Sequence, residues 1–186
     1  MRSEWERVLL MHSAPTLAGL KCGSLVRLSG AAEELTAAAR IWDAQLRLRG
    51  VRVRLARLDA GSALIYLYRT KLLRRDWEKP GAAEFLRLHG YRPEEPEEEN
   101  VARLLRRLTA CPCFPHEIGL FLGYPLEDVR GFMENCGRNY RLCGCWKVYG
   151  DPEAALRCFA RYRKCARLYL QRYTEGHSLS RLTVAG

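Results

Sequence analysis

Apolar side chains recur with a helical period in two long stretches of the chain. In residues 31–50 they occupy one face, acidic residues stand near the start, and Gly50 follows the last turn. These features fit the dipole and capping preferences of an α-helix. Asp151 and Pro152 form a typical helix start, and the apolar stripe behind them predicts a long helix over about 152–173. The outer side of that helix would carry Arg157, Arg161, Lys164 and Arg167.

Alternation of apolar and polar residues predicts strands in other parts of the chain. The sequence VRVRLARL at 51–58 alternates in this way, and a second β-rich run, SALIYLYR, ends at Arg69. Because Asp59-Ala60-Gly61 is a turn sequence, the two runs together predict a β-hairpin. Further strands are expected at 19–28 and in YRLCGCWKVY at 140–149.

Shorter helical patterns cover 71–77, 82–89 and 101–109. Residues 115–136 predict a helical hairpin with its turn at Gly123-Tyr124-Pro125, and the acidic stretch at about 92–100 predicts an exposed loop. Strands and helices do not alternate regularly along the chain. The sequence therefore predicts one α+β domain over 1–186, with a small, mostly antiparallel sheet of about four strands covered by several helices.

Composition and charge narrow the class of protein. With 186 residues, 48% of them hydrophobic, the chain suits a single globular core. It contains no run of eighteen apolar residues, and its N-terminal segment is unlike a secretory signal. We therefore expect a cytoplasmic protein with no membrane partner, whose eight cysteines are reduced thiols. The net charge of +10 fits nucleic acid, an acidic partner or an anionic small molecule, and separates none of them.

Four cysteines stand in two close pairs, Cys111 with Cys113 and Cys143 with Cys145. Four thiolates brought together would bind zinc or an iron–sulfur cluster. Both pairs have CxC spacing, however, whereas structural zinc sites typically use CxxC. On a strand, the second pair would share one face and could simply pack there. The four cysteines are therefore weak candidates, and no metal site is predicted.

His116 and Glu117 follow a proline at a predicted helix start. A histidine beside a carboxylate could act in acid–base catalysis or bind a metal, although such pairs more often belong to a cap or a hydrogen-bond network. The HExxH pattern of zinc proteases is absent, because Leu120 occupies the second histidine position.

The helical hairpin at 115–136 also has the outline of a helix-turn-helix. Its second helix carries Glu127, Asp128 and Glu134 but only one arginine, Arg130. Acidic side chains repel phosphates, so DNA reading by this hairpin is disfavoured.

Aromatic and basic side chains end two of the predicted strands. Tyr66 and Arg69 end one, and Trp146 and Lys147 end another. If these strands are neighbours, aromatic faces and cations would line a pocket for a planar, anionic ligand. The alternative is half-buried strand aromatics with cations that extend into solvent. Lys21 and Tyr124 complete the set of candidate ligand-binding residues.

Several segments together resemble a bacterial family catalogued as domain of unknown function 3793. They are APTLAGLKCGSL, ALIYLYR, FPHEIGLFLGYPLEDVRGF, CWKVYGD and HSLSRLTVA. The resemblance spans nearly the whole chain and implies a single-domain, soluble bacterial protein. It implies no activity, substrate or fold. The CPC element lies outside the family's pattern, which lowers the weight of a four-cysteine metal site.

Three functions remain open from the sequence. The first is a binding or accessory protein for an anionic small molecule or a metal-linked cofactor, with a cleft around 114–124 and 146–149. The second is an enzyme that uses His116 as its acid–base catalyst. The third is a module that binds nucleic acid or a protein partner through the basic face of the last helix. The oligomeric state is not predicted.

Overall fold

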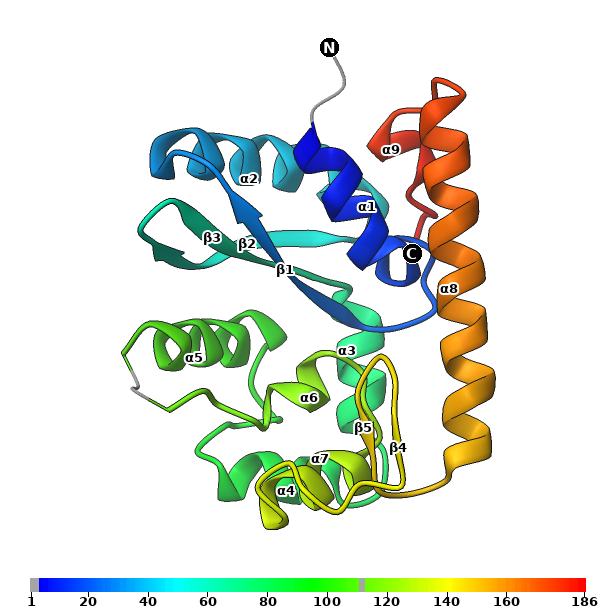
Figure 1. Cartoon of the computed structure of the whole chain (residues 1–186). Coiled ribbons are helices and arrows are strands. Elements are labelled where there is room, and N and C mark those ends of the chain that lie inside the picture. The colour runs from blue at the N-terminus through cyan, green and yellow to red at the C-terminus, as the bar shows by residue number, and fades with distance from the viewer. Residues whose placement is uncertain (1–3, 111–112) are drawn as a thin grey trace.

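The computed structural model describes residues 4–110 and 113–186 of the chain (Figure 1). The helices of its first half are α1 (Glu4–Leu17), α2 (Ala32–Leu46), the 3-10 helix Arg47–Arg49, α3 (Thr70–Trp77) and α4 (Ala82–Leu88). The later helices are α5 (Glu97–Ala110), α6 (Ile118–Phe121), α7 (Leu126–Glu134), α8 (Pro152–Thr174) and α9 (Leu179–Leu182). The strands are β1 (Gly23–Ser29), β2 (Arg52–Asp59), β3 (Ser62–Tyr68), β4 (Leu142–Cys143) and β5 (Lys147–Val148). The predicted α+β class is confirmed.

The main sheet is antiparallel, with strand order β1-β3-β2. The predicted hairpin of β2 and β3 forms with Asp59 opposite Ser62, and the register shifts between Leu55 and Arg57. Strand β1 starts at Gly23, four residues later than predicted, because the chain turns through 18–22 after α1.

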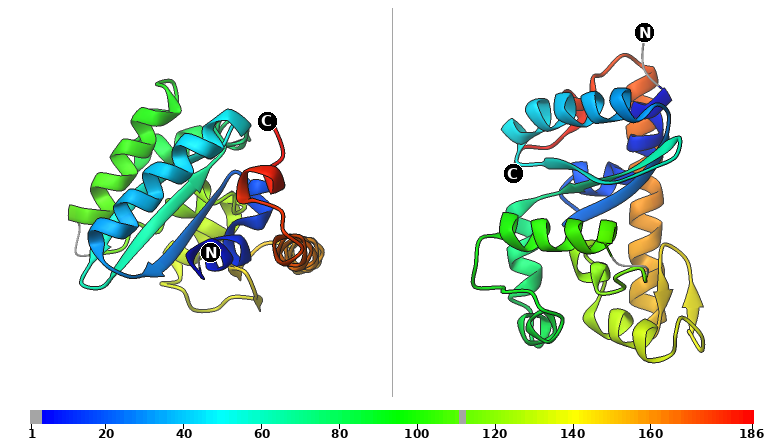
Figure 2. Two further views of the ribbon diagram at one scale, coloured as in Figure 1. Left: turned by 90° about the horizontal axis from the view of Figure 1, so that it is seen from above. Right: turned by 90° about the vertical axis from the view of Figure 1, so that its left-hand side faces the viewer.

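Strand β3 lies between two hydrophobic cores, because its side chains alternate between the two faces of the sheet. Ala63, Ile65 and Leu67 pack in the core that contains side chains of α1 and α2. Tyr66 and Tyr68 pack in the core formed with α3 to α7. Figures 1 and 2 show α1 and α2 on one side of the sheet, α5 and α6 on the other, and α8 running along both layers. Covering on both faces explains why β3 is apolar nearly throughout.

The prediction of a single strand over 140–149 is wrong. The segment folds back on itself as a hairpin, in which Leu142 pairs with Val148 and Cys143 with Lys147. The turn contains Gly144, where any Cβ would overlap the ring of Phe159 on α8. This contact comes from a distant part of the chain, so the local alternation of side chains could not reveal it.

Two boundaries in the middle of the chain also differ from the predictions. Helix α5 begins at Glu97, so the last part of the predicted loop at 92–100 is helical, and Glu97 is buried in an ion pair with Arg74. The predicted first helix of the hairpin at 115–136 is only the single turn of α6, because 115–117 form turns before it.

The long C-terminal helix is confirmed as α8. Asp151 caps it by accepting hydrogen bonds from the backbone N–H groups of Glu153 and Ala154. Among the helices of the described residues, none is long and apolar enough to cross a membrane.

Candidate functional site

Asp128 fastens the β4–β5 hairpin to α7. Its carboxylate is buried and accepts three hydrogen bonds: from Trp146 Nε1 at 2.7 Å, from Tyr149 N at 2.7 Å and from Gly150 N at 2.8 Å. Since one side chain satisfies both the indole and the backbone after β5, it sets the position of Trp146. Asp128 is therefore no surface acid on a recognition helix, and α6 is too short to be the first helix of a helix-turn-helix.

Close-packed glycines complete this unit. A Cβ at Gly131 in α7 would overlap the Tyr149 ring, and a Cβ at Gly150 would overlap the Glu127 side chain. Because glycine has no side chain at either position, the hairpin can lie directly on α7. These contacts account for two of the six glycines in residues 114–151.

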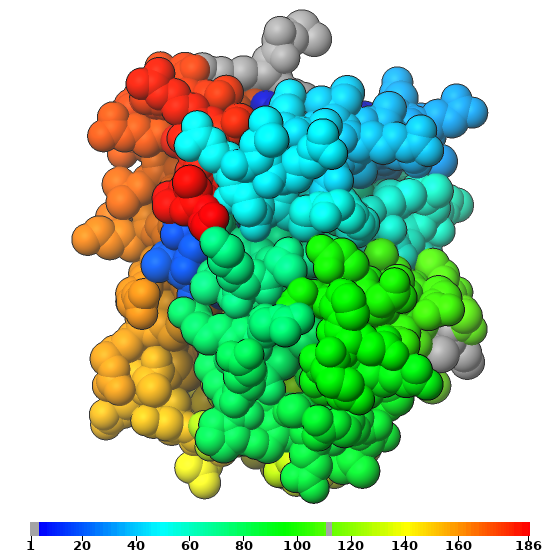
Figure 3. Space-filling model, turned by 180° about the vertical axis from the view of Figure 1, so that it is seen from behind, coloured from blue at the N-terminus to red at the C-terminus, as the bar shows by residue number. Residues whose placement is uncertain are grey.

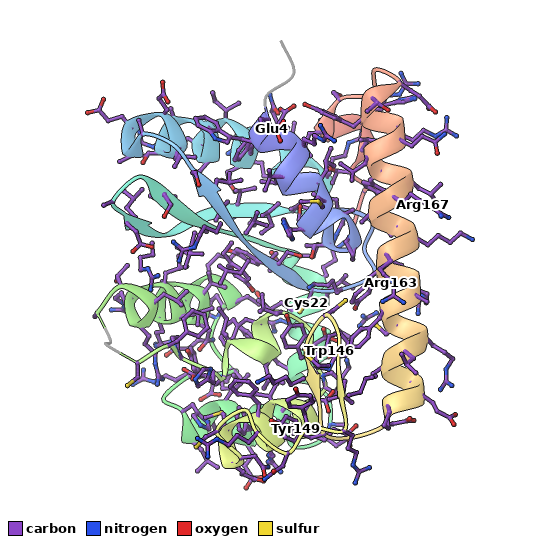
Figure 4. All side chains as sticks on the ribbon, viewed as in Figure 1. Glu4, Cys22, Trp146, Tyr149, Arg163 and Arg167 are labelled. Atoms are coloured by element: carbon purple, nitrogen blue, oxygen red, sulfur yellow. The ribbon has the colours of Figure 1, made fainter. Side chains whose placement is uncertain are left out.

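The hairpin presents an aromatic wall between α7 and α8. Trp146 stacks on Tyr124 at 4.9 Å between ring centroids and meets Phe159 edge-on at 4.5 Å. Tyr162, one turn further along α8, lies 6.5 Å from Trp146. Figure 4 shows Trp146 between α8 and the smaller helices. The wall therefore joins side chains from three separate parts of the chain.

A cavity of about 300 Å³ opens on one side of this wall. Six parts of the chain contribute to it: α1, the turn before β1, β1 itself, the α6–α7 turn, the β4–β5 turn and α8. The side chains important for its chemistry are His12, Lys21, Tyr124, Cys145, Tyr162 and Arg163. Figure 4 shows Arg163 on α8 near the level of Cys22, the neighbour of Lys21 in sequence.

Lys21 is the unusual group of this cavity. It is half-buried, and its Nζ lies 5.5 Å from the ring centroid of Tyr124 and 5.7 Å from that of Tyr162. Within the described part of the chain, no carboxylate pairs with this ammonium and no acceptor hydrogen-bonds to it. Burial lowers the pKa of Lys21 below the usual lysine value. Two tyrosine faces thus replace the acidic partner that a half-buried lysine normally has.

The chain matches one protein family over most of its length. The family model described as "Protein of unknown function (DUF3793)" matches residues 9–183. The chain belongs to this family. The matched range contains every residue of the aromatic wall and of the Lys21 cavity. No curated protein and no solved structure matches the chain.

A second cavity, of about 290 Å³, adjoins the first and shares Leu122, Tyr124 and Cys145 with it. Its lining is mainly apolar and aromatic and includes Trp146 and Lys147. Lys147 donates a hydrogen bond to the Gly137 carbonyl at 2.8 Å, so this cation is already held by the protein.

His116 lines the second cavity, but the side chain of Glu117 points away from it. The exposed His116 ring lies 4.8 Å from the Phe132 ring. Glu117 points into the core, where it accepts a hydrogen bond from Tyr91 Oη at 2.9 Å and pairs with Arg107 Nε at 3.2 Å. The geometry therefore separates the two residues that the sequence suggested as a catalytic pair, and gives Glu117 a structural role.

Tyr66 and Arg69 lie outside both cavities. Tyr66 is fully buried and donates a hydrogen bond to the Phe121 carbonyl at 2.7 Å, so no ligand could reach it. The predicted pocket between the aromatic ends of two strands required those strands to be neighbours. Strands β3 and β5 belong to different sheets, so this pocket does not form.

The buried Arg69 guanidinium binds the C-terminal tail. It donates hydrogen bonds to the carbonyl oxygens of Thr16, Leu17 and Val184. Figure 3 shows this tail, in red, against the segments that follow α2 and β3. Arg69 therefore connects α1, α3 and the tail, and it is not available for a ligand in the Lys21 cavity.

The cysteines do not form a metal site in the described residues. No group of three or more His, Cys, Asp or Glu side chains there could hold a metal ion. Cys143 and Cys145 are exposed on the hairpin, Cys113 is exposed elsewhere, and Cys111 lies outside the described residues.

Sequence reasoning missed three residues that build the site, namely Asp128, Tyr162 and Arg163. Asp128 stands in the first turn of α7, where a carboxylate often accepts backbone hydrogen bonds, but its partners lie about twenty residues away. Tyr162 lies in the apolar stripe that predicts the last helix, and it is half-buried there. Only the tertiary fold shows that this stripe meets Lys21.

Proposed function

We propose that the protein binds a small anionic molecule with a planar, apolar part in the cavity around Lys21. The observation that carries this proposal is the half-buried Lys21 ammonium, which no carboxylate neutralises in the described part of the chain. A cation that is partly removed from water gains when an anion enters beside it. Arg163 lines the same cavity and adds a permanent positive charge.

The lining supports the planar part of this ligand. Tyr124 and Tyr162 present aromatic faces to Lys21, and Trp146 stacks behind Tyr124. Each of the two adjoining cavities alone is close to the lower end of the size range for small-molecule sites. The shared wall of Leu122 and Tyr124 gives a ligand access to an apolar and to a charged region.

Fluorescence titration tests the proposal with three probes of increasing size: 4-methylbenzoate, phenyl phosphate and adenosine monophosphate. We expect saturable binding of at least one probe, a signal that depends on Trp146, and about tenfold weaker affinity in Arg163→Gln. Lys164→Gln is the matched control, because it removes a neighbouring α8 charge outside the cavity. Absence of saturable binding for all three probes would refute the proposal.

A second candidate function rests on the outer face of α8. Arg161, Lys164 and Arg167 are exposed, and no carboxylate of the described residues lies within 4.0 Å of them, whereas Arg157 pairs with Glu153 at 3.7 Å. Three unpaired cations on one helix could bind a polyanion such as a nucleic acid.

Fluorescence anisotropy with a labelled 20-nucleotide strand tests this second candidate. Binding should weaken steeply with added salt, and the triple variant R161Q/K164Q/R167Q should reduce the salt dependence by about one unit of slope for each lost contact. If the triple variant binds like the wild type, α8 does not bind nucleic acid.

A further inference from the structure

Lys21 has the surroundings of a reactive amine as well as those of an anion-binding cation. Its Nζ lies against two aromatic rings at 5.5 and 5.7 Å, inside a cavity that opens to solvent. No carboxylate in residues 4–110 and 113–186 holds the ammonium in its charged form. Lysines in such settings lose their proton more readily than exposed lysines and then carry a free electron pair.

The choice of residue supports a role for the amine itself. Arginine supplies 26 of the 31 basic side chains of the chain, and lysine only five. An arginine would supply the same positive charge but would stay protonated at any ordinary pH. Lysine at position 21 therefore provides something that the chain's usual cation lacks, which is a side chain that can become neutral.

We propose that Lys21 forms an imine with an aldehyde or ketone that carries a carboxylate or a phosphate. This inference rests on the proposed function, because the anionic group of the carbonyl compound would be bound by Arg163, which lines the same cavity. Arg163 keeps its charge when Lys21 becomes neutral, so the two residues divide the tasks of binding and reaction.

The reaction balances without an oxidant or a reductant. The electron pair of the neutral amine forms a bond to the carbonyl carbon, and the carbonyl π electrons move to oxygen. One proton passes from nitrogen to oxygen and gives a carbinolamine. The nitrogen electron pair then forms the C=N bond and expels the oxygen, which takes the second nitrogen proton and leaves as water. His12 lines the cavity, and its imidazole is able to carry this proton. Burial also lowers the pKa of Lys21, which increases the fraction of neutral amine near neutral pH.

Reductive trapping tests the inference on the wild-type protein. The protein is mixed with 4-formylbenzoate and sodium cyanoborohydride at pH 7, and labelled lysines are identified by peptide mass spectrometry. We expect Lys21 to carry a carboxybenzyl group several-fold more often than Lys164, an exposed lysine of the same protein, because its amine loses its proton more readily and Arg163 lines the same cavity and can bind the carboxylate of the probe. Equal labelling of the two lysines would overturn the inference.

Matched controls separate this inference from the proposed function. The carbonyl-free analogue 4-methylbenzoate should bind and protect Lys21 from labelling, and Lys21→Arg should lose the label at position 21 while Lys164 keeps its own. If 4-methylbenzoate binds but 4-formylbenzoate does not label Lys21, the imine is wrong and the binding function stands. If neither compound interacts with the cavity, both proposals fail.

Discussion

Replacing Asp128 by asparagine tests how the β4–β5 hairpin is held in place. The substitution keeps the size of the side chain but turns one of its two acceptor oxygens into a donor group. In the wild type, one oxygen accepts from Tyr149 N and Gly150 N and the other accepts from Trp146 Nε1. The asparagine amide must therefore face either the indole N–H or the two backbone N–H groups, and donor meets donor in both orientations.

The expected cost follows from these three bonds. A hydrogen bond to a charged group contributes about 1.5–3 kcal/mol, and a buried donor left without an acceptor costs a similar amount. Because the better orientation retains the two backbone bonds in weakened form, we expect a loss of about 2–4 kcal/mol in the free energy of unfolding. The matched control Glu134→Gln removes an exposed acid from the same helix and should change stability by less than about 0.5 kcal/mol.

Urea unfolding, followed by circular dichroism, measures the change in global stability. Tryptophan emission under native conditions reports whether the hairpin opens locally, since Trp146 would then move into water. We expect Asp128→Asn to lower the free energy of unfolding and to shift the emission to longer wavelength. A variant with wild-type stability and wild-type emission would refute the role of Asp128 as the attachment of the hairpin.

Three further predictions concern close packing, the C-terminal tail and pH. Gly131→Ala should destabilise the protein by about 1–3 kcal/mol in urea unfolding, because the new methyl group overlaps the Tyr149 ring; a gain in stability, as is usual for alanine in a helix, would contradict this contact. Arg69→Met should cost about 2–4 kcal/mol and speed carboxypeptidase digestion of the tail, since the carbonyl oxygens of Thr16, Leu17 and Val184 each lose a charged donor. An unchanged digestion rate would show that the tail is held by other contacts. Affinity for 4-methylbenzoate should fall as pH rises through the lowered pKa of Lys21, before an ordinary lysine loses its charge at about 10.4, and Lys21→Arg should remove this pH dependence.

Most elements of the fold could be predicted because their determinants are local. The β2–β3 hairpin follows from alternation and its turn, and α8 from its Asp151 cap and apolar stripe. The start of α5 was also encoded locally, since Pro96 followed by three glutamates is typical of a helix N-terminus. The acidic loop predicted at about 92–100 includes these glutamates, and the structure places them in the first turn of α5 instead.

The hairpin at 142–148 could not be predicted in the same way. Its turn depends on the contact of Gly144 with Phe159, and its attachment depends on Asp128, so both determinants are distant in sequence. Local alternation alone favours a straight strand there.

Only part of the candidate site could be predicted, because its residues also come from distant parts of the chain. Lys21 and Tyr124 do line one cavity, and Trp146 stacks on Tyr124. Tyr66 and Arg69 are similar in type to the true lining residues, but the topology places them in the core and at the tail. Residue type indicates what a side chain can do, whereas the sheet order decides which side chains meet.

The most direct test of the account is the titration of the five lysines by NMR after selective ¹³C labelling of their side chains. Both proposals require that Lys21 is partly buried and has no acidic partner. The account predicts that Lys21 titrates at a lower pH than the usual lysine value of about 10.4 and that saturating 4-methylbenzoate raises its pKa. If Lys21 titrates at the usual lysine value and does not respond to 4-methylbenzoate, the central claim is contradicted.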